Sequence, residues 1–240
     1  VIALTRPEQT ATPDKADEMQ SAASLISFFA TQLTTYQNES YAAEFTAVIR
    51  PFMNWLEKAG LDADHFGCKA ARALYRAMAI KDEYEVARLL TSSKARQNIT
   101  DMAGANAKIT YHLAPPFLSW IRDKDGHPRK LKFGGWLTPI LRGLGKMRHL
   151  RGRWYDPFGY GHAKQQEQRH KGAVMVWLQQ LGDIPQTCPA DQLDKMLDLM
   201  LSIRGYGHVK EQNYQAACPQ IEACLEAMRM PPHTVDTAAE

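Results

Sequence analysis

The sequence predicts a mainly helical protein, a helical bundle-like domain with one small antiparallel β element around residues 108–133. Three observations lead to this fold class. Apolar residues recur at the i, i+3, i+4 spacing of buried helix faces over most of the chain. Alternating strand formers occur in the middle of the chain, around an Asp-Gly turn signal. The 240 residues, 45% of them hydrophobic, are enough for a sizeable core.

Apolar stripes define helices in both halves of the chain. The helix that carries Tyr41 and Phe45 should end or bend near Pro51, because an interior proline loses a backbone donor and clashes with the preceding turn. Another helix should run from about residue 65 to 90, and the last from about 212 to 228. The other stripes consist of Leu25, Phe28, Phe29, Leu33 and Tyr36, of Val174, Trp177, Leu178 and Leu181, and of Leu193, Met196, Leu197, Met200 and Leu201.

The β element is expected in the middle of the chain. KITYHL (108–113) alternates and is rich in strand formers, and APPF interrupts it. DKDGHP (123–128) contains the Asp-Gly signal of a hairpin, and RKLKF then alternates again. The following segment, GGWLTPILRGLGKMRHLRG, is apolar-periodic but interrupted by glycines and a proline, so its helix should be short or irregular.

The chain is expected to hold one main domain. It opens with Val1 and a short apolar stub, and a Pro/Thr/Glu/Asp-rich stretch follows. Residues 1–20 are therefore interpreted as the end of a preceding domain plus a linker, 21–230 as a helical C-terminal domain, and 231–240 as a frayed tail. The sequence contains no run of 18 apolar residues and no secretory signal pattern, which predicts a soluble cytoplasmic protein without membrane contact.

Positive charge is concentrated in one part of the sequence. Between Arg122 and Lys171 there are 13 Lys and Arg against 4 Asp and Glu, which leaves 16 against 22 in the rest of the chain. A basic patch of this kind attracts nucleic acid, phosphorylated small molecules or an acidic protein. The alternative is that these side chains are spread over several solvated faces. The pI of about 8.6 is low for a nucleic-acid-binding protein, so a nucleic-acid partner is not expected.

Common catalytic and cofactor motifs are absent from the sequence. It contains no phosphate-binding G-x-x-x-x-G-K-[ST] loop, no H-E-x-x-H, no G-x-S-x-G and no G-D-G thiamine-diphosphate motif. The four cysteines do not form a C-x2-C pair, so they are expected to be buried free thiols, and no metal ligand is assigned. A self-contained enzyme is disfavoured, and no catalytic residue is assigned.

The first candidate site segment is KDEYEVARLL (81–90). Glu85 lies three residues after Asp82 and three before Arg88, and Tyr84 shares a helix face with Arg88. Paired carboxylates could serve as general acid and base. An ion-pair network with Arg88, exposed to solvent or between domains, fits the segment better.

The second candidate segment is YHLAPPF (111–117). Its two prolines fix φ and stiffen the exit from the predicted strand, so His112 should point in a defined direction. That would suit a ligand contact. A buried histidine hydrogen-bonded to the backbone is the favoured alternative.

RHLRGRWYDPFGY (148–160) is the most charged and aromatic segment. Arg148, Arg151 and Arg153 stand among four aromatic residues that include Tyr160, a mixture that can bind phosphates and stack on planar groups. Asp156 begins a turn signature, because an aspartate can bond the following backbone and the Pro and Gly after it favour a turn. Structural and binding roles remain equally open here.

IRGYGHVKEQN (203–213) resembles an active-site loop because it holds glycine, histidine and lysine together. It lies between two predicted helices, which favours a connecting turn in which Gly205 supplies the left-handed residue of a helix C-cap. His208 and Lys210 would then begin the next helix, and Arg204 could neutralise carbonyls at the end of the preceding one. The three side chains remain candidates for an interdomain contact.

Several of these segments together resemble a known family. KDEYEVARLL, YHLAPPF, KFGGW, a basic helix leading to LRG, DPFGY and IRGYGHVKEQN are similar, in this order, to the C-terminal domain of the long fused indolepyruvate:ferredoxin oxidoreductases. LTTYQNESYAAEF (33–45) resembles the segment that precedes that domain, so the resemblance covers roughly residues 21–230. Ile80 departs from the family, where an aromatic residue is expected.

The resemblance implies a parent enzyme that oxidatively decarboxylates an aryl 2-oxo acid to an acyl-CoA and reduces ferredoxin. It implies thiamine diphosphate, magnesium and [4Fe–4S] clusters in domains before this one, with CoA as co-substrate. It implies partners in those catalytic domains, ferredoxin as a further one, and a homo-oligomeric parent. No catalytic role follows for this domain. The alternative is an independent module whose basic aromatic segment binds a nucleotide, CoA or an acidic protein.

Overall fold

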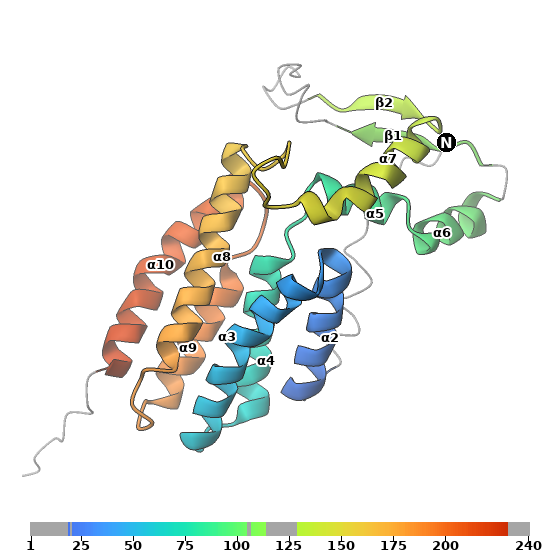
Figure 1. The fold of residues 1–240 in the computed structure, drawn as a ribbon. Helices are drawn as coiled ribbons and strands as arrows, with labels where there is room; N and C mark the ends of the chain where they lie inside the picture. Colours follow the sequence, from blue (N-terminus) through green and yellow to red (C-terminus); the bar gives the residue numbers. More distant parts are fainter. Residues whose placement is uncertain (1–18, 20, 105–106, 114–128, 230–240) are drawn as a thin grey trace, which may run out of the picture. The chain divides into compact units, whose positions relative to one another are not determined.

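A computed structural model describes residue 19 and residues 21–104, 107–113 and 129–229. It confirms the mainly helical fold class: the described residues form nine α-helices, one 3-10 helix and a two-stranded antiparallel sheet (Figure 1). Apart from residue 19, the predicted linker and the predicted tail lie outside the described residues. None of the described helices is long and apolar enough to cross a membrane.

The chain divides into two compact units, a division that the sequence did not suggest. We call the part formed by Ala16–Ile80 and Gly161–Glu240 the bundle unit, and the part formed by Lys81–Tyr160 the middle unit. The chain therefore leaves the bundle unit after its third described helix and returns to it 80 residues later.

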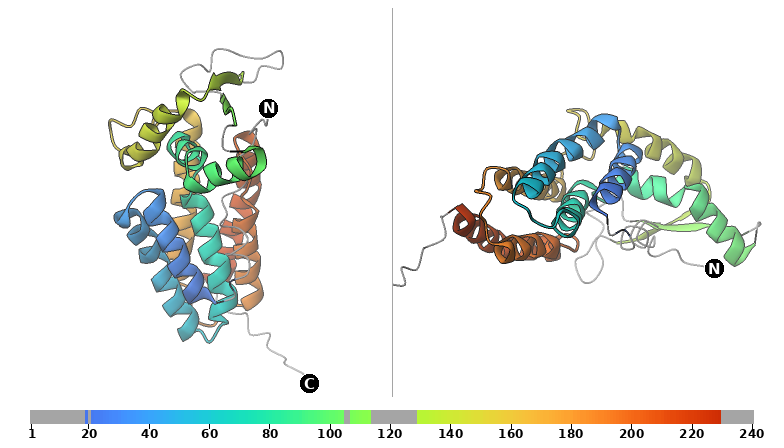
Figure 2. Two further views of the ribbon diagram at one scale, coloured as in Figure 1. Left: turned by 90° about the vertical axis from the view of Figure 1, so that its right-hand side faces the viewer. Right: turned by 90° about the horizontal axis from the view of Figure 1, so that it is seen from below.

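Among the described residues of the bundle unit there are six helices (Figures 1 and 2). The first three pack on one another, the third also contacts the fourth and fifth, and the fifth packs along the sixth. Their inward faces form one continuous apolar core that contains the predicted stripe residues Leu25, Leu33, Leu178 and Leu193. The helices are α2 (Ala22–Tyr36), α3 (Glu39–Lys58), α4 (Ala63–Met78), α8 (His162–Leu181), α9 (Ala190–Ser202) and α10 (His208–Arg229).

Local chemistry explains where these helices begin. Asn38 accepts a hydrogen bond from the Tyr41 amide at 2.9 Å, which caps the start of α3. Asp62 caps α4 in the same way through the His65 amide. The helix boundary considered near Pro51 does not occur: α3 continues through this exposed residue, because its buried stripe extends beyond it to Leu56 and outweighs one lost hydrogen bond.

The middle unit holds a smaller core. Tyr111 and Phe133 face each other in the sheet, where the antiparallel register also pairs His112 with Lys132. Tyr111 packs with Ala87, Leu90 and Leu141 from the helices. The Asp-Gly turn between the strands lies outside the described residues. The elements are α5 (Glu83–Leu90), α6 (Ser93–Ala103), β1 (Thr110–Leu113), β2 (Leu131–Gly134), α7 (Leu137–Lys146) and the 3-10 helix η2 (Met147–Leu150).

The helix expected over residues 65–90 is two helices. The first, α4, ends at Met78, and Asp82 then begins α5 by accepting a hydrogen bond from the Glu85 amide at 3.0 Å. The prediction was wrong because Asp82 serves as an N-cap in extended backbone conformation and not as a residue within a helix face. This break is where the chain passes from the bundle unit to the middle unit.

Candidate functional site

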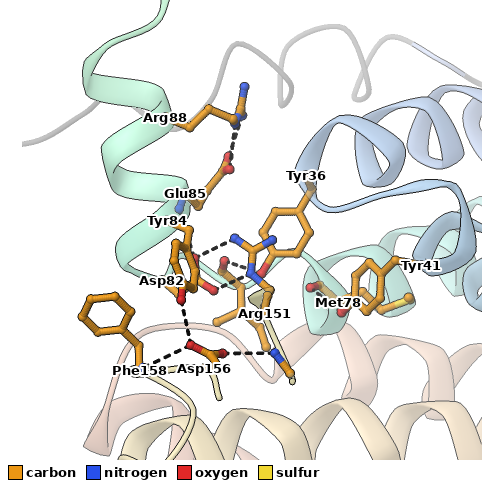
Figure 3. A network of polar contacts seen from close by, with 12 residues as sticks. Tyr36, Tyr41, Met78, Asp82, Tyr84, Glu85, Arg88, Arg151, Asp156 and Phe158 are labelled. Atoms are coloured by element: carbon orange, nitrogen blue, oxygen red, sulfur yellow. Dashed lines mark hydrogen bonds and ion pairs between the residues drawn. The ribbon is translucent and has the colours of Figure 1, made fainter. Parts of the chain in front are cut away.

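Two of the candidate segments meet in a buried polar network of the middle unit (Figure 3). Arg151 donates to both carboxylate oxygens of Asp82, through Nε at 2.5 Å and through Nη2 at 2.8 Å. Both side chains are 4% exposed, so the pair is desolvated. Asp82 also caps the start of α5. One carboxylate therefore binds both the first turn of this helix and Arg151, which lies 69 residues further along the chain.

A second carboxylate, that of Asp156, organises the turn that follows Arg151. The residue is completely buried and accepts three hydrogen bonds: from the Tyr84 hydroxyl at 2.9 Å, the Gly152 amide at 3.0 Å and the Phe158 amide at 3.1 Å. Gly152 adopts a φ of +73°, a conformation that favours glycine. The turn is thus closed on itself and tied to α5.

Tyr84 contacts both halves of the network: it binds Asp156 and lies beside Arg151, the partner of Asp82. Its ring is 1% exposed, meets the edge of the Phe158 ring with 5.3 Å between centroids, and lies 5.7 Å from the Arg151 guanidinium (Figure 3). Burial, followed by the hydrogen bond to Asp156, raises the pKa of Tyr84. The phenol therefore stays protonated and serves as a hydrogen-bond donor, not as a general base.

Glu85 and Arg88 form a separate ion pair on α5. Two hydrogen bonds of 2.8 and 2.6 Å join the carboxylate to the guanidinium (Figure 3). Behind this pair α7 approaches α5 at Gly145, where an added Cβ would lie 3.1 Å from the backbone N and Cα of Arg88. Glycine is the residue that permits this close contact.

The site consists of the buried network of Asp82, Arg151, Tyr84 and Asp156 and the Glu85–Arg88 pair beside it. Each of its three carboxylates, Asp82, Glu85 and Asp156, already binds a donor from within the unit. Among the described residues, no group of three or more His, Cys, Asp and Glu side chains is arranged to hold a metal ion. We call the contacts among Asp82, Tyr84, Arg151 and Asp156 the brace, because they hold the turn after Arg151 against α5.

The turn that the brace holds in place exposes aromatic side chains. We define the aromatic turn as residues 151–160. Trp154 is 82% exposed, Tyr155 is 48% exposed and Tyr160 is 68% exposed. Trp154 and Tyr155 contact edge to face at 5.2 Å, and the Tyr160 hydroxyl donates to the Trp154 carbonyl. Arg153 is exposed beside them, so a rigid base displays an arginine and three aromatic rings.

The structure separates the remaining predicted site residues. In the middle unit, His112 lies partly exposed on β1 and Arg148 lies partly exposed in η2. Arg204 and His208 are exposed in the bundle unit, where His208 begins α10 as expected. Lys210 is 8% exposed and pairs with Glu167 of α8.

IRGYGHVKEQN is a helix connection in the structure. Gly205 adopts a φ of +110°, two residues beyond Ile203, the C-cap of α9, so the left-handed residue comes one position later than in a standard glycine cap. The Asn213 side chain donates to the Arg204 carbonyl at 2.7 Å and closes the connection. The stretch thus links α9 to α10, and its Lys210 is a buried charged residue in the first turn of α10.

His170 of α8 is a buried titratable group that the sequence analysis missed. Its Nε2 lies 3.0 Å from a carboxylate oxygen of Glu211, and its ring centroid lies 4.2 Å from that of Tyr214. Its Nδ1 is buried and has no hydrogen-bond partner among the described residues. Its burial could have been predicted, because His170 lies four and seven residues before Val174 and Trp177 and so shares their buried helix face.

We expect His170 to make the bundle unit less stable in mild acid. Burial, reinforced by the charge of Lys210, lowers the pKa of His170 although Glu211 and Glu167 oppose the shift. The unfolded chain then binds the extra proton, so stability falls as the pH decreases from about 6.5 towards the folded-state value, by at most about 1.4 kcal/mol per pH unit. Urea unfolding between about pH 7.5 and 5.5 checks this, with His170→Gln as the variant of weaker dependence. An NMR titration of His170 with a pKa above 6.5 would contradict it.

Comparison with known proteins shows the family of the chain. A protein-family model described as "Family of unknown function (DUF6537)" matches residues 22–223. No curated protein and no solved structure matches the chain.

Proposed function

The chain belongs to the DUF6537 family, and we propose that it is a non-catalytic auxiliary domain of an indolepyruvate (aryl 2-oxoacid):ferredoxin oxidoreductase. The proposed parent enzyme converts the 2-oxo acid to an acyl-CoA and passes the electrons to ferredoxin. Its thiamine diphosphate, magnesium and iron–sulfur clusters would be held by other domains, since this chain contains none of their sequence motifs.

The observation that carries the proposal is the brace. Two of the ordered motifs that resemble the family, KDEYEVARLL and DPFGY, supply Asp82, Tyr84 and Asp156, and LRG supplies Arg151. Residues from motifs that are far apart in the sequence thus contact one another in a single polar network. Because their polar groups are satisfied internally, they support a role in presenting a surface, not in bond-making chemistry.

The aromatic turn is the surface that this role requires. Exposed tryptophan, tyrosine and arginine side chains are enriched among the residues that dominate protein–protein binding energy. Trp154, Tyr155 and Arg153 are such residues, and their backbone is held in place before any partner arrives. We propose that this turn contacts the catalytic domains of the parent enzyme.

Expression of the whole reading frame tests the proposal. The segment upstream of Val1 is expected to encode a thiamine-binding G-D-G motif and a ferredoxin-type cysteine run. The purified enzyme should reduce ferredoxin with indolepyruvate and CoA in a thiamine-dependent reaction. A reading frame without these motifs, or an enzyme inactive on every aryl 2-oxo acid tried, would contradict the proposal.

Charge reversal in the basic segment must spare Arg151. This side chain is buried against Asp82, so replacing it with glutamate would bring two carboxylates together and unfold the unit. Arg153 is exposed and Arg148 partly exposed, so these two positions can be reversed without breaking the brace. Any loss of turnover in an Arg148→Glu, Arg153→Glu enzyme then reports on the exposed surface and not on the brace.

A second candidate function is an independent module that binds a nucleotide or CoA. The exposed Trp154 beside Arg153 favours it, because a ring and a guanidinium can hold a base and a phosphate. Titration of the 240-residue chain with CoA at about 50 mM salt separates the two functions. Saturable binding that is lost in Trp154→Ala would favour the module, and no binding would exclude it.

A further inference from the structure

The outward side of α7 carries a row of apolar side chains that nothing in the proposed function uses so far. Trp136, Ile140 and Met147 are 63, 56 and 41% exposed, and Gly143 between them is exposed as well. Ile140 and Gly143 share one side of α7, and Trp136 and Met147 flank the helix as its N-cap and C-cap residues at i, i+4, i+7, i+11 spacing. The opposite side, which includes Leu141, packs into the core of the middle unit. We call these four residues the α7 row.

Both ends of the α7 row have packing contacts within the middle unit. The Trp136 ring meets the Phe133 ring of β2 edge to face at 6.2 Å, and Gly134 leaves room for it, since a Cβ there would lie 3.2 Å from the Trp136 ring. Gly145 fixes the far end of α7 against the backbone of Arg88. A preorganised anchor of this kind loses little entropy on binding.

Positive charge lies along the row. Arg142 and Lys146 are exposed and one helical turn apart on the flank nearest Gly143. The sequence from residue 127 to 155 contains no Asp or Glu at all. These two cations favour a partner that brings negative charge over one that brings positive charge, because like charges across an interface cost several kcal/mol. The same rule opposes a symmetric pairing of two copies, which would place these cations against one another.

We propose that the α7 row binds an acidic protein surface, with a partner side chain entering the gap that Gly143 leaves between Ile140 and Met147. This inference rests on the proposed function for the identity of the partner: an acidic protein that accepts electrons, the ferredoxin of the parent reaction. The aromatic turn would then contact the enzyme's own domains, and the α7 row would receive the mobile partner. Tryptophan, methionine and arginine are the side chains enriched at such interfaces.

Gly143 provides a variant that separates docking from folding. An added Cβ there meets no atom within 4 Å, and the residue does not have a positive φ. Gly143→Glu therefore leaves α7 intact, and it fills the gap with a carboxylate that repels an acidic partner. Gly143→Ala fills little of the gap and adds no charge. Gly172→Glu is the matched control, because Gly172 is an exposed glycine of α8 with equally open surroundings.

Titration of the 240-residue chain with a [4Fe–4S] ferredoxin at about 50 mM salt is the direct test. The wild-type chain should bind, and binding should weaken with added salt. Gly143→Glu should weaken it by about tenfold or more, while Gly143→Ala and Gly172→Glu keep wild-type affinity. Equal affinity of Gly143→Glu and wild type would overturn the proposal. The proposal would also be overturned if the chain did not bind ferredoxin but bound anionic phosphatidylserine vesicles through the row.

The parent enzyme separates failure of this inference from failure of the proposed function. Gly143→Glu should raise the KM for ferredoxin about tenfold and leave turnover with methyl viologen unchanged, because the small dye does not need the docking surface. An unchanged KM for ferredoxin would overturn docking on the α7 row alone. A wild-type enzyme without 2-oxo acid turnover would overturn the proposed function, whereas the binding difference between the chain variants would stand.

Discussion

Replacing Asp82 with alanine should destabilise the middle unit by about 3–5 kcal/mol, because Arg151 would remain buried without its counter-ion. The variant also loses the cap of α5, which adds about 1 kcal/mol. Native-state hydrogen exchange of the α5 and α7 amides measures the effect locally, and the α3 amides of the bundle unit provide an internal reference.

Two further variants test the cause of that loss. Asp82→Ala combined with Arg151→Met removes the unpaired charge, so the double variant should be more stable than Asp82→Ala alone. Asp101→Ala, at an exposed position in α6, is the matched control and should change stability by less than about 0.5 kcal/mol. Additive losses from Asp82 and Arg151 would contradict the ion-pair explanation.

Replacing Tyr84 with phenylalanine should destabilise the middle unit by about 1–3 kcal/mol. The ring keeps its contacts with Phe158 and Arg151, while Asp156 loses one of its three donors. Exchange of the α5 amides reports the loss. Tyr206→Phe is the control, because that tyrosine is 67% exposed and its change should have no measurable effect. A Tyr84→Phe chain as stable as wild type would show that the hydroxyl does not hold the turn.

Sequence periodicity predicted most of the bundle unit correctly. The three predicted stripes, which begin at Leu25, Val174 and Leu193, are buried except for Phe28 and Leu201, which are partly buried. A helix can hide an apolar stripe only by packing it inward. The two alternating segments pair as β1 and β2, with Tyr111 opposite Phe133. GGWLTPILRGLGKMRHLRG is a short helix that ends in a 3-10 turn, as its glycines suggested.

The break between α4 and α5 was missed although its signal was present. Asp82 and Glu85 have the spacing of a capping pair, but the same spacing also describes neighbours on a helix face. The structure shows the Glu85 amide donating to Asp82, while the Glu85 side chain turns to Arg88. Local spacing alone could not separate these two arrangements.

The brace could not be predicted from the residues that form it. Arg148, Arg151 and Arg153 are equivalent in sequence, and only the path of the turn decides that Arg151 reaches Asp82. Likewise, the turn signature at Asp156 predicted bonds to its own backbone but not the hydroxyl of Tyr84. Such contacts between distant segments depend on packing that periodicity does not encode. The division into two units escaped the sequence analysis for the same reason.

The central claim is that the motifs on which the proposed function rests build a brace and take no part in bond-making chemistry. Turnover of the proposed parent enzyme carrying Tyr84→Phe, with methyl viologen as electron acceptor, tests it most directly. Because Tyr84 is buried and its raised pKa keeps the phenol protonated, the rate per folded enzyme should stay within about twofold of wild type. A loss of about a hundredfold or more in a fully folded enzyme would contradict the claim and place Tyr84 in the reaction.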